Sequence, residues 1–343
     1  MNLTKKFKFS KKKPILIAEI SANHNGSKKR FLKLINSAFE SGADMVKIQT
    51  YEPKDITINE KKDYLKIKKG LWKNRYLWDL YEEAQTPFSW HKEAFKIAKK
   101  RKKLIFSSPF SLRGVDLLEK LNTPIYKISS FEITDFKLIN YIASKKKPII
   151  ISTGMSSLNE IKKAIKEINK FHNKVIIMHC VSKYPTELKD SCIGNILSLK
   201  KTFKKNHIGL SDHTENIYSS IASLPLGIVA IEKHFRLDEN KKSADYKFSL
   251  TPKMFKNLKK IIDDVSYSLN KKNNNNLSNY NIKFRRSIFA SKDIKKNEEI
   301  SKKNIETLRP NVGIDAANYF DILGKKTKNI IKKNSPIYKN DLK

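Results

Sequence analysis

The chain has 343 residues, of which 39% are hydrophobic and 10% aromatic, a composition that excludes a chain disordered throughout. Its 71 lysines and arginines against 34 aspartates and glutamates give a formal net charge of +37. The basic residues are spread along the whole sequence, so this charge indicates a solvated lysine-rich surface and argues against the clustered patch of a nucleic-acid-binding protein.

Three features bear on location. The basic residues 5–13 precede an apolar stretch, 15–20, that is too short for the core of a signal peptide and contains Glu19. The longest later apolar stretch, 220–231, contains Pro225 and is shorter than the roughly 18 residues that span a bilayer. The chain's two cysteines are too few for a disulfide framework. We therefore expect a soluble cytoplasmic protein that contacts no membrane.

Short apolar runs that end in polar residues recur along the chain. Most are nearly continuous apolar stretches, which is typical of strands buried on both faces of a parallel sheet. Between them, apolar residues recur at helical spacing, and Gly42, Pro124 and Pro148 mark where helices end. The runs are 15–21, 45–51, 104–110, 125–130, 148–154, 175–182, 207–213 and 228–235.

Eight such strand–helix units predict an α/β protein with a (β/α)₈ TIM barrel. The alternative is an open, doubly wound sheet. The barrel is favoured because polar residues follow all eight runs, as expected where a site is built around the whole C-terminal rim. An open sheet would concentrate such residues at one crevice.

Two segments fall outside the repeating pattern. Residues 52–90 form a longer aromatic insertion, which is either a lid over the rim or a helical pair packed on the barrel. The low-complexity residues 270–283 predict a linker that separates the barrel domain, 1–269, from a second unit, 284–343. A unit of about 60 residues is only marginally stable alone, so we expect it to dock on another surface.

Two histidines end neighbouring predicted strands. His213 is the last residue of the seventh run, and His234 lies at the end of the eighth. Two imidazoles at adjacent strand tips can share one divalent metal, with carboxylates or water completing the coordination shell. A structural role for the pair is the alternative, and spacing alone leaves both open.

Two lysines and two carboxylates belong to the same predicted rim. Lys47 and Lys127 stand beside serine hydroxyls, and together these groups suit a phosphate or carboxylate ligand; the alternative is ordinary surface lysines. Glu19 and Glu132 can each accept a proton or orient a water molecule. A Cys–His nucleophile at 179–180 is rejected, because consecutive strand residues point to opposite faces.

Longer motifs surround these residues. They are Ala18–Ser27, Val46–Tyr51, Phe106–Phe110, Tyr126–Glu132, Ser152–Met155, Tyr184–Thr186, Gly209–Thr214, Ile231–Phe235 and Lys247–Leu250. Through them the chain resembles the sialic-acid synthase family over nearly its full length, and within that family its pseudaminic acid branch. The second unit resembles the family's antifreeze-like (SAF, β-clip) domain through 284–287, 308–310 and 322–325.

The resemblance implies an enzyme that condenses phosphoenolpyruvate with an open-chain deoxy-amino sugar and water, releasing phosphate. On the pseudaminic branch the sugar is 2,4-diacetamido-2,4,6-trideoxy-β-L-altropyranose and the product is a nine-carbon nonulosonic acid. N-acetylneuraminate or legionaminate synthesis is the nearest alternative. An alternative of another class is a non-catalytic polyanion-binding protein, which would bind DNA tightly at physiological salt without turnover.

The resemblance also implies roles for individual residues. His213 and His234 would bind Mn²⁺ or Mg²⁺, and Glu19 or Glu132 would stabilise charge or activate water. Arg309 would reach the site of the other subunit of a homodimer. The residues expected to bind substrate are Lys47, Gln49, Ser108, Lys127, Ser130, Ser152, Ser182, Tyr184, Ser211, Asp245 and Arg309.

Overall fold

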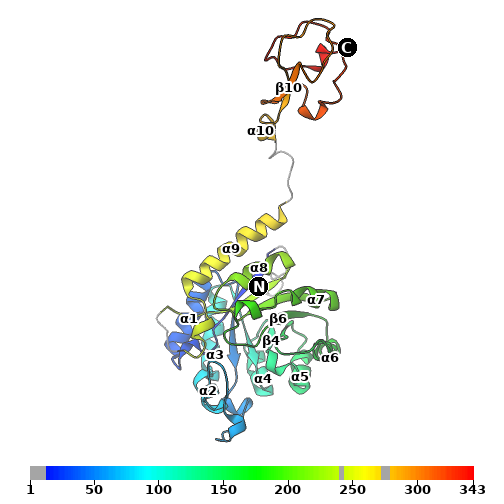
Figure 1. The fold of residues 1–343 in the computed structure, drawn as a ribbon. Coiled ribbons are helices and arrows are strands. Elements are labelled where there is room, and N and C mark those ends of the chain that lie inside the picture. The colour runs from blue at the N-terminus through cyan, green and yellow to red at the C-terminus, as the bar shows by residue number, and fades with distance from the viewer. Residues whose placement is uncertain (1–12, 239–242, 272–278) are drawn as a thin grey trace. The chain divides into compact units, whose positions relative to one another are not determined.

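The computed structural model describes residues 13–238, 243–271 and 279–343 (Figure 1). The chain divides into two compact units, the first ending at Asn270 and the second beginning at Lys271. The basic residues 5–12 and residues 272–278 of the expected linker lie outside the described residues. In the described part of the chain, no helix combines the length and apolar character that crossing a bilayer requires.

The first unit is built on eight parallel strands that close into a barrel in chain order, with β8 paired to β1. The predicted TIM barrel is therefore confirmed, and the open sheet is excluded. The strands are β1 (Ile15–Glu19), β2 (Met45–Thr50), β3 (Leu104–Pro109), β4 (Tyr126–Ile128), β5 (Ile149–Ser152), β6 (Val175–Cys180), β7 (His207–Asp212) and β8 (Ala230–His234).

Helices surround these strands (Figure 1). Local sequence explains where they begin, as α6 illustrates. The Ser157 hydroxyl accepts a hydrogen bond from the Glu160 N–H, and the Glu160 carboxylate accepts one from the Ser157 N–H. These two hydrogen bonds form a capping box at the start of α6. The helices are α1 (Lys28–Glu40), α2 (Leu77–Ala84), α3 (Phe88–Lys100), α4 (Leu112–Lys120), α5 (Phe136–Ser144), α6 (Leu158–Asn169), α7 (Asn195–Thr202), α8 (Tyr218–Ala222) and α9 (Pro252–Asn270).

The core of the first unit has two layers, because strand side chains alternate between two faces. One face packs against the helices, as Leu16 and Val46 do together with Phe31. The other face fills the barrel interior with a separate apolar cluster that includes Ile17 and Phe106. This interior cluster seals the lower part of the barrel, so side chains further along the same strand faces form the floor of any site at the C-terminal rim.

The insertion between β2 and α3 contains α2 and two 3-10 turns, Pro53–Asp55 and Asp63–Leu65. The second unit has a core of its own, rich in isoleucine. Its antiparallel pair is β9 (Ser287–Ala290) and β10 (Ile305–Leu308), and its remaining elements are the short α10 (Asn279–Ile282) and the 3-10 turns Ala316–Asn318 and Lys339–Asp341.

Residues 337–338 of the second unit are β-prone in sequence but do not form a regular strand in the structure. Ile337 is buried and its N–H donates to the Ile288 carbonyl over 2.9 Å, but the neighbouring Pro336 makes only an isolated bridge with Phe289. Proline has no N–H to donate, so the ladder stops there.

Candidate active site

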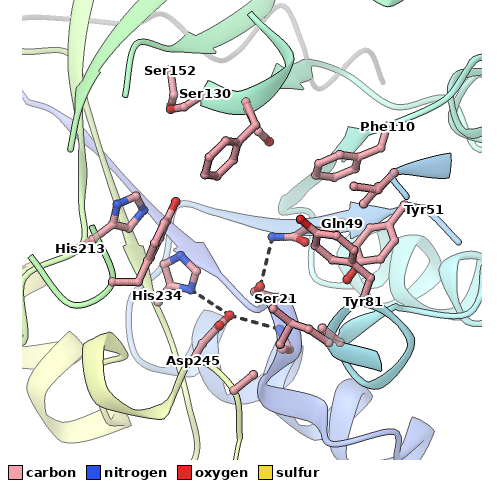
Figure 2. A pocket seen from close by; sticks show the side chains of 18 of the residues that line it. Ser21, Gln49, Tyr51, Tyr81, Phe110, Ser130, Ser152, His213, His234 and Asp245 are labelled. Atoms are coloured by element: carbon pink, nitrogen blue, oxygen red, sulfur yellow. Dashed lines mark hydrogen bonds and ion pairs between the residues drawn. The ribbon is translucent and has the colours of Figure 1, made fainter. Parts of the chain in front are cut away.

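A cavity of about 400 Å³ opens at the C-terminal ends of the barrel strands. Its floor consists of polar side chains from the strand ends, and part of its wall comes from the insertion between β2 and α3. Figure 2 shows the imidazoles of His213 and His234 on one side of the pocket, and Tyr51, Tyr81 and Phe110 on the other. The pocket thus has a polar floor with a histidine end and an aromatic end.

The floor is organised around one carboxylate, that of Glu232 on β8. Its Oε1 accepts from Lys47 Nζ over 2.7 Å, and both of its oxygens lie 3.0 Å from Lys127 Nζ. The Ser211 hydroxyl donates to Oε1 over 3.1 Å. Lys47 also lies 3.2 Å from Glu19. All five side chains are buried, so the cluster is a charged unit largely shielded from bulk solvent.

The charges of this cluster follow from burial and from mutual attraction. Burial alone would raise the pKa of Glu232, but the two ammonium groups outweigh it and hold that pKa well below its ordinary value. Burial lowers the pKa of Lys127 to about 8, against the attraction of Glu232. Burial also raises the pKa of Glu19. Two cations therefore face the firmly ionised Glu232, and Glu19 is the more easily protonated of the two carboxylates, so the floor is suited to an anionic ligand.

The two histidines lie close together, with ring centroids 5.4 Å apart. The Nδ1 atom of His213 lies 2.9 Å from the Val181 carbonyl oxygen, and that of His234 lies 3.4 Å from Asp245 Oδ2. Such contacts favour the tautomer in which Nδ1 carries the proton and the Nε2 lone pair is free. Metal-binding histidines commonly donate a hydrogen bond through the ring nitrogen that does not bind the metal. The donor set therefore fits a divalent metal.

Beyond the two imidazoles, the residues that the structure describes supply no further side-chain ligand for the metal. Among residues 13–238, 243–271 and 279–343, no group of three or more histidine, cysteine, aspartate or glutamate side chains is arranged to hold a metal ion. Two imidazoles would thus be the contribution of the described residues, and water and substrate oxygens could complete the coordination shell.

Glu132 lies in the short 3-10 turn Ser130–Glu132 after β4 and lines the pocket. Its Oε2 is buried and has no hydrogen-bond partner in the described part of the protein. Burial raises the pKa of Glu132 to about 7. A carboxyl group that titrates near neutral pH can both give and take a proton at that pH, which suits an acid–base role.

Serine hydroxyls complete the polar surface. The Oγ atoms of Ser108, Ser152 and Ser182 are buried and, within the described ranges, without a hydrogen-bond partner. Gly154 allows this crowding, because a Cβ at that position would lie 2.3 Å from Ser182 Oγ and 2.5 Å from Ser130 Cβ. Buried hydroxyls without partners are costly unless a ligand satisfies them.

Comparison with known proteins agrees with this architecture. The model of the NeuB family matches residues 34–274, and that of the SAF domain matches residues 285–343. The chain belongs to the NeuB family. The resemblance to the sialic-acid synthase family and to its SAF domain is thereby confirmed.

Three comparisons give the similarity of this NeuB protein to known proteins. It is 40% identical to a pseudaminic acid synthase of Campylobacter jejuni over 94% of each chain. It is 38% identical to an N,N'-diacetyllegionaminic acid synthase of the same species, over 92% of this chain and 96% of that one. The crystal structure of an N-acetylneuraminic acid synthetase from Leptospira borgpetersenii, in complex with citrate, superposes with a TM-score of 0.70 at 26% identity, covering 79% of this chain and 91% of that one.

Most candidate residues of this NeuB chain meet in the pocket. Ser108 and Glu19 are buried and Ser182 is half-buried, but none of the three is among the lining side chains; Glu19 accepts from Gln49 Nε2 over 3.1 Å. Arg309 is exposed in the second unit, whose placement relative to the pocket is not determined. The candidates that line the pocket are Lys47, Gln49, Lys127, Ser130, Glu132, Ser152, Tyr184, Ser211, His213, His234 and Asp245.

Sequence analysis missed Glu232 as a site residue. Strand alternation carries the signal, because Glu232 and His234 lie two apart on β8 and therefore share a face. The aromatic wall had no such signal, since its members come from segments far apart in sequence. Those wall residues include Tyr51, Trp72, Tyr81, Phe110, Phe131 and Phe248.

Side-chain alternation along β6 also separates the two residues of the rejected Cys–His pair. His179 points away from the pocket, with Nε2 2.8 Å from the Ser191 carbonyl oxygen. Cys180 faces the pocket instead, and its Sγ lies 3.8 Å from His213 Nδ1.

The raised pKa of Glu132 predicts a pH-dependent stability. Its folded-state pKa of about 7 exceeds the ordinary carboxyl value, so the folded protein binds this proton more tightly and loses stability as pH rises from about 4.5 to 7. Glu132→Gln removes this loss. Between pH 5 and pH 8, the free energy of unfolding of the variant should rise relative to that of the wild type by up to about 3 kcal/mol, as measured by urea unfolding. Glu82→Gln, at an exposed carboxylate, is the control and should track the wild type at both pH values.

Proposed function

We propose that this protein is a pseudaminic acid synthase. It condenses phosphoenolpyruvate with the open-chain form of 2,4-diacetamido-2,4,6-trideoxy-β-L-altropyranose and with water, and releases phosphate. The observation that carries the reaction class is the pair of buried lysines that share Glu232 in the same pocket as two imidazoles. The identity to pseudaminic acid synthases supports the choice of sugar.

Phosphoenolpyruvate carries the negative charge that this floor suits. Lys47 and Lys127 would bind its carboxylate and phosphate as point charges. The hydroxyls of Ser130 and Ser152, which line the pocket, would donate to phosphate oxygens. Because the cluster is buried, each of these contacts is stronger than it would be in water.

The nucleophile is C3 of phosphoenolpyruvate, so no enzyme nucleophile is needed. The C3–C1 bond forms as the π bond of the sugar aldehyde breaks and its oxygen takes up a proton, and positive charge develops at C2. Water adds at C2 and gives up one proton. The C2–O bond to phosphate then breaks, the ketone forms, and the remaining hydroxyl proton leaves with phosphate. A divalent cation held by His213 and His234, Mn²⁺ or Mg²⁺, would polarise the aldehyde as a Lewis acid. Glu132 would take the proton of the incoming water, and Glu19 would stabilise the charge at C2.

The sugar would occupy the part of the pocket near the insertion. Asp245 and Tyr184 line the histidine end, where hydroxyl and amide groups can be bound. Apolar side chains of the insertion, Ile56, Leu77 and Leu80, line the wall and suit the methyl groups of a deoxy, acetylated sugar. Legionaminate synthesis is the second candidate, because that sugar family shares these groups and its synthase is 38% identical.

In this proposal the protein is a homodimer that works in the cytoplasm, where phosphoenolpyruvate is available. Each second unit would present Arg309 to the pocket of its partner. Exposed apolar side chains of that unit support an interface, since Val312 is 47% and Phe320 75% exposed.

The choice of sugar is tested by incubating the purified protein with phosphoenolpyruvate, Mn²⁺ and single candidate sugars, and following phosphate release. We expect release with 2,4-diacetamido-2,4,6-trideoxy-β-L-altropyranose and at least tenfold slower release with the legionaminate and N-acetylneuraminate precursors. Release with none of the acylamino sugars would contradict the proposed reaction.

The metal role is tested with His234→Ala. Losing one of two imidazoles should abolish metal-dependent phosphate release while the melting temperature stays within a few degrees of the wild type. His172→Ala, at a histidine outside the pocket, serves as the control. Wild-type turnover by His234→Ala would mean that this imidazole has another role.

The phosphoenolpyruvate role is tested with Lys127→Ala. Losing a buried charged contact of about 2–3 kcal/mol should raise the KM for phosphoenolpyruvate roughly 100-fold with little change in the KM for the sugar. The exposed Lys137→Ala is the matched control and should behave as the wild type. An unchanged KM for phosphoenolpyruvate in Lys127→Ala would rule out this assignment.

A further inference from the structure

The residues that precede the two histidines pair with each other behind the barrel wall. Asp212 and Lys233 are register partners on β7 and β8, and their side chains lie 3.2 Å apart with 1% and 0% exposure. Strand alternation directs them away from the interior, because Ser211 and Glu232 meet inside it. This ion pair therefore joins the two strand tips on the face opposite to the pocket.

The pair also holds the backbone that follows His213. Asp212 Oδ1 accepts from the Thr214 N–H over 2.9 Å and from the Thr214 hydroxyl over 2.8 Å. Lys233 Nζ donates to the Thr214 carbonyl and lies 3.2 Å from the hydroxyl oxygen. His213 thus lies between Asp212, which is a member of the ion pair, and Thr214, which is held by both members of the pair. The Ser220 hydroxyl donates to Asp212 Oδ2 over 2.6 Å and fixes the carboxylate itself.

A second connection reaches the loop after β6. The Thr186 N–H donates to the His213 carbonyl over 2.9 Å, and Thr186 bridges Thr214 in parallel. That loop carries Tyr184, whose ring centroid lies 4.4 Å from that of His213. The backbone of His213 is therefore held on both sides, and its ring is packed against an aromatic side chain.

A buried ion pair adds little net stability, because removing two charges from water costs about as much as their attraction returns. Its more useful property here is geometric. These side-chain hydrogen bonds of Asp212 and Lys233 all end on Thr214 or Ser220, in the segment that directly follows His213. The ion pair connects that segment to Lys233, the residue before His234. Small shifts of either strand tip would change the distance between the imidazoles.

We propose that Asp212 and Lys233 are positioning residues that set the separation and orientation of His213 and His234 for binding one divalent cation. This inference rests on the metal site of the proposed function. It assigns to the outer face of β7 and β8 a role in metal binding, although neither side chain reaches the pocket.

The test compares Mn²⁺ binding by full-length protein variants, followed by electron paramagnetic resonance of free Mn²⁺. The double variant Asp212→Asn/Lys233→Met removes both charges together and keeps side-chain size, so no uncompensated buried charge remains. We expect its Mn²⁺ affinity to fall at least tenfold, while circular dichroism and phosphoenolpyruvate binding stay as in the wild type.

The control is the double variant Asp44→Asn/Lys259→Met. This pair joins α9 to the residue directly before β2, with 2.8 Å between Lys259 Nζ and Asp44 Oδ2, but neither residue lines the pocket. It should bind Mn²⁺ as the wild type does. If Asp212→Asn/Lys233→Met does not fold, Thr214→Val is used instead, which removes only the shared hydroxyl and should weaken Mn²⁺ binding several-fold.

The outcomes separate this inference from the proposed function. Wild-type Mn²⁺ affinity in a folded Asp212→Asn/Lys233→Met variant, or in Thr214→Val where that variant replaces it, overturns the positioning role and leaves the metal site standing. A wild-type protein that binds no Mn²⁺ overturns the metal site and this inference with it. Equal losses in Asp212→Asn/Lys233→Met and Asp44→Asn/Lys259→Met would also overturn the inference, because the effect would then be general destabilisation.

Discussion

The contact between Glu232 and the two lysines makes the rest of the pocket possible. Two ammonium groups buried side by side would repel each other and would each lose their hydration. The Glu232 carboxylate, 2.7 Å from Lys47 and 3.0 Å from Lys127, stabilises both ammonium groups but does not neutralise their combined charge. The Ser211 hydroxyl in turn stabilises the carboxylate. The floor can therefore stay folded without ligand and still attract an anion.

The barrel supplies the dry surroundings that this cluster needs. Along β1, Ile17 belongs to the interior apolar cluster, and Glu19, two residues on, reaches the polar cluster. The same change from apolar to polar occurs along β2, from Met45 to Lys47. The lower interior is thus closed, and the charged groups face one opening at the rim. Low effective permittivity then strengthens every interaction with a bound anion.

Reaction class and sugar choice have different structural origins in this proposal. The lysines, Glu232 and the imidazoles come from barrel strands and from the residue directly after β7, and they would serve any sugar of the family. The wall that would contact the sugar's substituents comes largely from the insertion between β2 and α3. This division fits the comparisons, in which synthases named for different sugars share 38 to 40% identity with the chain.

The sequence by itself determined the eight strands and their order around the barrel. Buried parallel strands are continuous apolar runs, and such runs can be recognised in the sequence without knowing which strands pair with them. It also indicated that His213 and His234 stand at strand ends, and the family motifs indicated the reaction. Lys47 and Lys127 were expected at strand ends as well, but they lie within β2 and β4, on the side that faces the barrel interior. Side-chain alternation within a strand is local, so the inward face of each strand was readable in principle.

Only the tertiary structure decided which of these groups meet. Glu232 lies between Lys47 and Lys127 because closure of the barrel brings β2, β4 and β8 to one floor, and no spacing along the chain encodes that distance. The register between the neighbouring strands β7 and β8 places Asp212 beside Lys233 behind the histidines. Folding of the insertion over the rim, likewise, placed Leu80 and Tyr81 in the pocket wall. Such contacts depend on packing between segments far apart in sequence, which local patterns do not carry.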